Sequence, residues 1–146
     1  MNNRMKKLYV FVLVISFVGF IFTNKVNAQA DVTTSLCMKY IVSPFISDGQ
    51  QYKALLNGEE IAEFHATFYG GTIYRIVGAS GQSEGNLVFS LYDKERNLLF
   101  TNRDYDNSPY WDFKFTSTID CIIEAGLDSE NKTASGFAIL LIGFKQ

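Results

Sequence analysis

The chain has 146 residues, with 15 acidic side chains, 13 basic side chains, two cysteines and one histidine. Four of the 13 basic residues lie before residue 29, whereas all 15 acidic residues lie after it, so nine bases and 15 acids remain there, for a formal charge of −6. An acidic surface with scattered cations repels phosphate backbones, which excludes nucleic acid as the expected partner.

The first 28 residues have the layout of a secretory signal peptide. A basic segment (residues 4–7) is followed by the 15 uncharged residues Leu8–Phe22 and then by a polar stretch with small residues. Signal peptidase is expected to cut before Gln29 or, at a second site, before Asp31. An uncleaved anchor is the alternative, but 15 helical residues span only about 22 Å of a hydrocarbon core of about 30 Å. We therefore expect an exported, periplasmic or extracellular protein with no membrane span after cleavage.

Residues 29–50 form the predicted N-terminal segment, with one candidate helix. The helix is predicted over Val32–Tyr40, with Asp31 as its N-cap and Pro44 beyond its end. From Gln51 onward, alternating apolar and polar residues recur between turns that are rich in Gly, Asn and Asp, a pattern typical of strands.

Eight short strands are predicted in this second part of the chain. In chain order they are Gln51–Leu56, Glu63–Tyr69, Thr72–Ala79, Leu87–Tyr92, Leu98–Thr101, Trp111–Phe115, Ile119–Ala125 and Phe137–Phe144. Phe137–Phe144 is apolar at nearly every position, so we expect it at the centre of a sheet, covered on both faces. No long helix pattern is present to cover the other apolar faces, and a second sheet must do so. Residues 51–146 are therefore predicted to form an all-β, antiparallel β-sandwich of the jelly-roll type.

Several of these segments also resemble a known family when they are taken in order. They are an apolar strand with a Gly turn before a tyrosine strand (Phe64–Tyr74), a Leu-Tyr-Asp hairpin (Leu87–Phe100), an Asp/Asn loop (Asp104–Asn107), an aromatic strand (Trp111–Phe115) and two terminal strands (Ile119–Ala125, Phe137–Phe144). The order resembles the bacterial pre-peptidase C-terminal domain, a small jelly-roll module of secreted proteins. Asn97 and Cys121 stand where that family usually has Gly and Tyr. The resemblance implies a sandwich without catalytic residues of its own.

The loop between the fifth and sixth predicted strands holds the candidate binding residues. They are Asp104, Tyr105, Asp106, Asn107 and Tyr110. Oxygen ligands in a loop suit Ca²⁺, although the spacing of a helix–loop–helix calcium site is missing, and a solvated turn is the alternative. Exposed rings beside the loop suit a sugar or a protein surface. Trp111 is expected in the core, because it alternates in phase with two phenylalanines. No other cofactor or metal is expected.

His65 and the two cysteines are the remaining groups with chemistry of their own. His65 lies on the polar face of a predicted strand, and we expect it to be exposed, which makes a hydrolase a remote alternative. One histidine and two distant cysteines do not form a zinc site. Outside the cytoplasm, Cys37 and Cys121 are a candidate disulfide; two buried thiols are the alternative.

The residues together predict a non-enzymatic, exported module that binds or supports another macromolecule, protein or glycan, at the bacterial cell envelope. The alternative is a small carbohydrate- or calcium-binding sandwich that uses the loop of residues 104–111.

The signal peptide gives a direct test. We expect the exported protein to begin at Gln29 or Asp31, which intact-mass measurement will show. Exported protein that still carries Met1–Phe22 contradicts cleavage.

Overall fold

A computed structural model describes residues 28–81, 85–128 and 135–146. Within these residues it has eight strands and a one-turn 3-10 helix, η1. They are, in chain order, β1 (Phe45–Asn57), β2 (Ile61–Phe68), β3 (Ile73–Ser80), β4 (Leu87–Tyr92), β5 (Leu98–Thr101), η1 (Asn102–Tyr105), β6 (Tyr110–Lys114), β7 (Ile119–Leu127) and β8 (Ser135–Lys145). The predicted signal peptide lies almost wholly outside the described residues.

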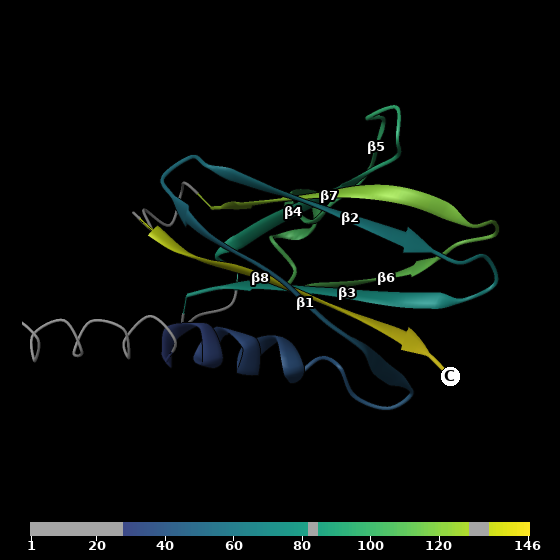
Figure 1. Cartoon of the computed structure of the whole chain (residues 1–146), viewed down its shortest axis with the longest axis horizontal. Helices are drawn as coiled ribbons and strands as arrows, with labels where there is room; N and C mark the ends of the chain where they lie inside the picture. The colour runs from purple at the N-terminus through teal and green to yellow at the C-terminus, as the bar shows by residue number, and fades with distance from the viewer. Residues whose placement is uncertain (1–27, 82–84, 129–134) are drawn as a thin grey trace, which may run out of the picture.

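The strands form two four-stranded sheets (Figure 1). Sheet A has the order β1-β8-β3-β6, and sheet B has the order β2-β7-β4-β5. The antiparallel pairs are nested, β4 with β5, β3 with β6, β2 with β7 and β1 with β8. The chain is thus one long antiparallel ribbon that is bent over itself, which is the jelly-roll arrangement. The predicted all-β sandwich is confirmed, and β8 lies inside sheet A as its unbroken apolar sequence predicts.

The main core fills the space between the two sheets. Every second residue of a strand points to the same face, so the alternating positions of β4 and β7 supply one side of this core. Phe89 and Ile123 are fully buried from sheet B, and Ile76 and Leu140 are fully buried from sheet A. The polar positions of the same strands face outward, as their alternation predicts.

A helix covers the other face of sheet A. Residues 28–38 are helical and lie against this sheet on the side away from sheet B (Figure 1). Cys37 is fully buried there, in a second apolar cluster with Val77, Ile139 and Leu141. No helix within the described ranges is long and apolar enough to cross a membrane.

The predicted bounds of this helix were wrong at both ends. The helix includes residue 28 and ends at residue 38, whereas Val32–Tyr40 was predicted. Asp31 therefore lies within the helix and is not its N-cap. Two contacts involve the helical residues that precede Asp31. The Thr33 hydroxyl donates to the Gln29 carbonyl at 3.0 Å, and Ala30 is buried in the cluster against sheet A.

Strand β1 begins earlier than predicted. It starts at Phe45, not at Gln51, and its register against β8 shifts between Ser47 and Gln51. The sequence Ser47-Asp48-Gly49 reads as a turn, and Gly49 has a φ of 84°. In the fold this turn-like sequence is an irregularity within a strand, because the flanking residues on both sides pair with β8.

One buried amide ties β4 to the segment between β5 and β6. Asn102 is fully buried, and its Oδ1 accepts from the Phe89 N–H at 2.9 Å. Its Nδ2 donates to the carbonyls of Leu87 and Ser108, each at 3.0 Å. A buried polar group that lacks such partners is destabilising, so these bonds fix where η1 leaves the sandwich.

We expect Asn102→Ala to lower the free energy of unfolding by about 3 kcal/mol, because it leaves three buried backbone groups without this partner. Urea denaturation measures the loss. The control is Asn97→Ala in an exposed turn, with an expected loss below about 1 kcal/mol. Equal losses in the two variants contradict the role given to Asn102.

Candidate functional site

The five residues that the sequence marks as binding candidates do not converge. Asp104 and Tyr105 lie in η1, and Asp106 follows in the left-handed conformation, with all three exposed. Asn107 turns back instead, and its Nδ2 donates to Asp128 Oδ2 at 3.1 Å. Tyr110 lies on the side of sheet A that the helix covers. The outer part of this loop therefore consists of the first three residues only.

Tyr110 and its neighbours secure the end of the helix segment. The Tyr110 ring packs on Tyr40 with centroids 5.0 Å apart. The Arg75 guanidinium lies over the rings of Tyr110 and Phe45, at 4.4 and 4.1 Å, and pairs with both carboxylate oxygens of Asp112. This contact set is a structural clamp, and it leaves Tyr110 half-buried.

In the part of the chain that the structure describes, no group of three or more His, Cys, Asp or Glu side chains could hold a metal ion. Asp106 and Asn107 both have positive φ angles, 53° and 51°. The calcium alternative at this loop stays a prediction.

An aromatic and apolar surface lies beside the loop instead. Tyr105 stacks on Phe100 with centroids 5.6 Å apart and planes 11° from parallel. Its centroid is 4.2 Å from that of Trp111. Trp111, which we predicted in the core, is half-buried and packs against the edge of the core. Rings thus run in contact from the buried Phe89, through Phe100, to the exposed Tyr105.

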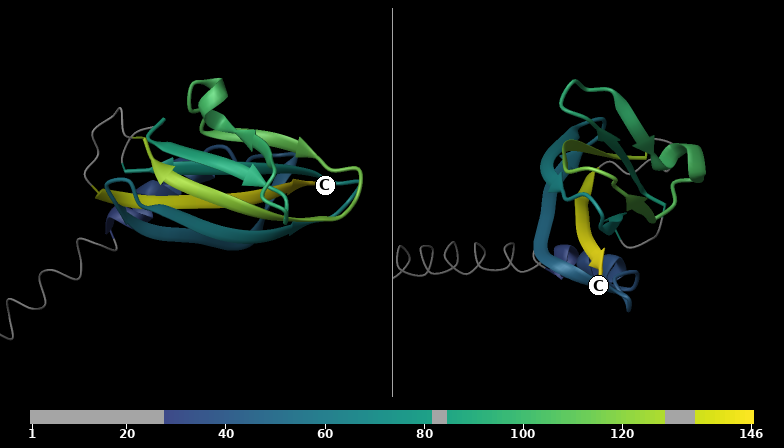
Figure 2. Two further views of the ribbon diagram at one scale, coloured as in Figure 1. Left: turned by 90° about the horizontal axis from the view of Figure 1, so that it is seen from above. Right: turned by 90° about the vertical axis from the view of Figure 1, so that its right-hand side faces the viewer.

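Two adjacent leucines of β5, which precede Phe100 and point to opposite faces of the strand, are also exposed. Leu98 is 54% exposed, Leu99 is 46% exposed and Tyr105 is 48% exposed. The sequence carried a signal for them, because two consecutive apolar residues in a strand cannot both face the same core. We call Leu98, Leu99, Phe100, Tyr105 and Trp111 the aromatic lip. The segments β5 and η1, which carry four of these residues, project from the sandwich (Figure 2).

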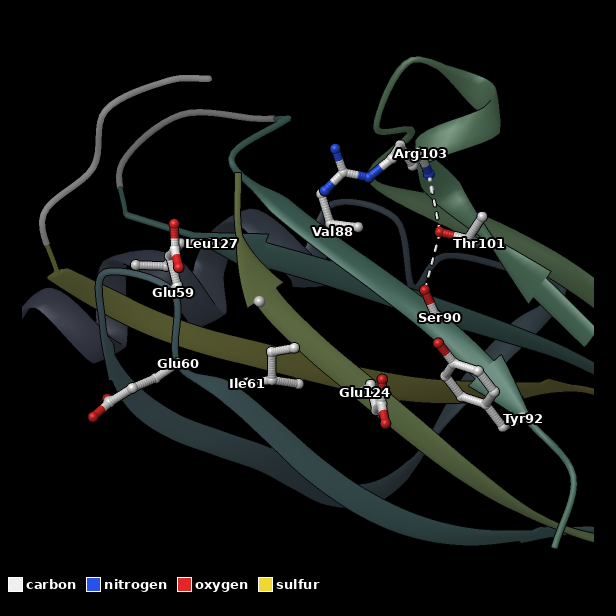
Figure 3. Close-up of a pocket in the computed structure, with 11 residues that line it drawn as sticks. Glu59, Glu60, Ile61, Val88, Ser90, Tyr92, Thr101, Arg103, Glu124 and Leu127 are labelled. Atoms are coloured by element: carbon white, nitrogen blue, oxygen red, sulfur yellow. Dashed lines mark hydrogen bonds between the residues drawn. The ribbon is translucent and has the colours of Figure 1, made fainter. Parts of the chain in front are cut away.

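A groove on the outer face of sheet B adjoins the aromatic lip. It has a volume of about 320 Å³ and is lined from β2, β4, β5, η1 and β7 (Figure 3). Hydroxyl groups form part of its floor, where Ser90 Oγ donates to Thr101 Oγ1 at 3.0 Å. The Arg103 N–H donates to the same oxygen at 3.4 Å, which links the groove to η1. Charged residues at its margins include Glu59 and Glu124.

Ion pairs also lie on the outer face of sheet B, beside the groove. Arg96 has a φ of 62°, and its guanidinium reaches the carboxylates of Glu63 and Glu124. The hydrogen bond from Arg96 lowers the pKa of the Glu63 carboxyl. Lys94 pairs with Asp120 at 2.6 Å and lowers the pKa of that carboxyl in the same way. These carboxylates are exposed and remain ionised, as groups on a solvated strand face do.

His65 lies on this outer face, as its alternation with apolar neighbours predicts. Its Nε2 is 3.0 Å from Glu63 Oε1, and its side chain is 71% exposed. The nearby Thr67 hydroxyl donates to Asp120, so it has no contact with the imidazole that could activate it. A histidine in a nucleophilic mechanism needs a nucleophile within hydrogen-bond reach, and this arrangement does not provide one.

The two cysteines are free thiols in different clusters, so the candidate disulfide is not formed. Cys37 lies between the helix and sheet A, whereas Cys121 lies in the core between the sheets. The alternation of Ile119, Cys121 and Ile123 predicts a core position for Cys121, and the sequence gives no such signal for Cys37. Burial raises the pKa of Cys37 to about 12 and that of Cys121 to about 11. Thiols of this kind are poor nucleophiles at neutral pH.

Comparison with known proteins gives little more than the fold. No family model and no curated protein matches the chain, and the resemblance to the pre-peptidase C-terminal domain stays a prediction. Among solved structures, Aeromonas hydrophila PliG, a periplasmic lysozyme inhibitor of g-type lysozyme, is similar over 68% of this chain and 90% of its own. The sequence identity is 10% and the TM-score is 0.48. A likeness of this size does not identify binding residues.

The thiols give a test of the core. In the folded protein at pH 8 we expect almost no reaction with a disulfide reagent, and in urea without reductant we expect two reactive thiols per chain. The raised pKa values also predict that stability falls as the pH rises above about 8.5, where unfolded thiols ionise and folded ones do not. If no thiol reacts in urea, the two cysteines form a disulfide, and that result contradicts the structure.

Proposed function

We propose that this domain is a non-enzymatic, exported module that binds another protein through the aromatic lip and the adjoining groove. The export part of the proposal rests on the layout of residues 1–28. The binding part rests on one observation, which is that three large apolar side chains stand about half exposed on one projection of the fold. Leu98, Leu99 and Tyr105 have no described segment over them.

The anatomy of this surface fits a protein interface. The centres of such interfaces are enriched in aromatic residues, and their rims are polar. Here the rings of Tyr105 and Trp111 are in contact, and the charged residues Arg103, Asp104 and Asp106 lie beside Tyr105 in the chain. Tyr105 is held by ring stacking, so little side-chain freedom remains to be lost on binding.

The groove extends the same surface with hydrogen-bonding groups. Ser90, Thr101 and Arg103 lie next to the aromatic lip, and within the described residues nothing packs on this face of sheet B. A partner that covers both regions would gain an apolar centre and polar contacts at its edge. The net charge of −6 after residue 28 favours a partner whose contact surface is basic.

A sugar at the loop is the weaker alternative. Sugar binding by stacking needs a free ring face. Tyr105, Phe100 and Trp111 are in contact with one another, so much of their ring surface is already covered. The exposed leucines beside them are also more useful to an apolar protein contact than to a ligand rich in hydroxyl groups.

Photocrosslinking in the producing cells tests the proposal. A photoreactive phenylalanine at position 105 is expected to give one discrete protein adduct, which mass spectrometry identifies. The same residue at Lys53, exposed on β1 at the far edge of sheet A, is expected to give none.

A matched pair of variants makes the test specific. Leu98 and Leu55 are each 54% exposed on edge strands, so Leu98→Asp and Leu55→Asp should both fold. Leu98→Asp is expected to abolish the adduct at position 105, because it places a charge in the apolar centre, and Leu55→Asp is expected to leave it unchanged. An adduct that survives Leu98→Asp contradicts the proposed interface.

A further inference from the structure

A second opening lies on the side of the sandwich opposite the aromatic lip. Strand β1 is one edge of sheet A and β2 is one edge of sheet B, and between them is a cleft of about 600 Å³. The aromatic lip uses the other two edge strands, β5 and β6. The cleft and the lip therefore do not overlap, and the inference below does not depend on the proposed protein interface.

Aromatic rings form the floor and walls of this cleft. Phe68 and Tyr74 are buried beneath it and pack edge to face, with centroids 5.0 Å apart. Tyr52 is half-buried on β1 and packs edge to face on Phe64 at 5.7 Å. Tyr69, directly after β2, is 64% exposed. The cleft thus has accessible ring surface above a floor that cannot collapse without disturbing the core.

The exposed Tyr69 stands on a backbone that is already fixed. Its N–H donates to the hydroxyl of Tyr74 at 3.1 Å. The next residue is fixed as well, because the Gly70 N–H donates to Thr118 Oγ1 at 3.2 Å. Exposing a large ring to water is unfavourable, and here hydrogen bonds hold the backbone of Tyr69 in place at the mouth of the cleft. Such preorganisation favours binding, because less freedom is lost when a ligand arrives.

Hydrogen-bonding groups line the mouth. Gln50 Oε1 accepts from the Tyr52 hydroxyl at 3.0 Å, and the Gln50 N–H donates to Asp48 Oδ1 at 2.9 Å. Within the described residues, Gln50 Nε2 makes no hydrogen bond. Thr67 and Thr72 add hydroxyl groups to the lining. The rim therefore offers both donors and acceptors around the rings.

We infer that this cleft binds a neutral sugar ring of a glycan. A pyranose has C–H groups on its faces, which suit the electron-rich face of a tyrosine, and hydroxyl groups around its perimeter, which both donate and accept. The cleft has this combination of Tyr52 and Tyr69 with Gln50, Asp48 and Thr72. Its volume lies within the range of small-ligand sites.

Other ligand classes fit the lining less well. A quaternary ammonium ligand needs several ring faces and an uncompensated negative charge. Of the nearby carboxylates, Asp120 is paired with Lys94, and Asp48 Oδ1 accepts from the Gln50 N–H. An acyl chain would leave the Gln50 Nε2 group without a partner, whereas a sugar hydroxyl can accept from it.

Binding is tested on the purified protein with three neutral trisaccharides, maltotriose, cellotriose and tri-N-acetylchitotriose, at up to 10 mM. We expect at least one of them to shift the backbone amide NMR signals of Gln50 and Tyr69 and not those of Leu99 and Tyr105. Choline chloride at the same concentration is expected to shift none of them.

Two matched variants show whether the cleft is responsible. Tyr69→Ala removes an exposed ring and is expected to weaken sugar binding about tenfold, as the loss of one ring contact would. Tyr105→Ala removes an exposed ring on the aromatic lip and is expected to change the affinity less than about twofold. The inference is overturned if no trisaccharide shifts the cleft signals, if choline shifts them instead, or if Tyr105→Ala weakens binding and Tyr69→Ala does not.

Discussion

The position of the aromatic lip depends on the side chain of Asn102. A buried amide has one acceptor and two donor hydrogens, and Asn102 uses the oxygen and the nitrogen on three backbone groups of β4 and of the residue before Pro109. A shorter side chain would not reach, and a charged one would be costly to bury. The chain leaves β5 at this residue, so the same bonds set the direction of η1. Tyr105 stacks on Phe100 because that direction is fixed.

The outer faces of the two sheets are covered differently, and this difference determines where the protein has exposed surface for a partner. Sheet A has the helix of residues 28–38 on its outer face, and the apolar residues Val77, Ile139 and Leu141 are buried there. Sheet B carries charges and hydroxyl groups at the equivalent positions. Its ion pairs through Lys94 and Arg96 are exposed and contribute little to stability. They keep this face hydrated, and the exposed residues Leu98, Leu99 and Tyr105 lie at its edge, on β5 and η1.

Much of the fold could be predicted because alternation has a direct physical cause. Leu87–Tyr92 and Leu98–Thr101 were predicted at their observed bounds, since each is enclosed by residues that favour turns. The start of β1 was missed, because Asp48 and Gly49 favour a turn and only pairing with β8 keeps the strand together. The helix was misplaced because its contacts with sheet A are made by residues far along the chain, such as Ile139, which lies 102 positions after Cys37.

Less of the site could be predicted, for the same reason. Tyr105 was identified as an exposed ring from its place in a polar loop. The side-chain contacts of Asn107 and Tyr110 are made with Asp128 and Tyr40, which approach them only in the folded chain. The cleft between β1 and β2 has no sequence signature, because its rings alternate as core residues do and the gap between the sheets exists only in three dimensions.

The nested pairing also governs when the fold can form. The last strand, β8, lies between β1 and β3, so sheet A has no continuous hydrogen-bonded centre until residues 135–145 are present. A chain that is still being synthesised holds β1 and β3 without the strand that joins them. Contacts between such distant segments make folding slow. The order of the strands therefore delays the completion of sheet A until the C-terminal end of the chain is present.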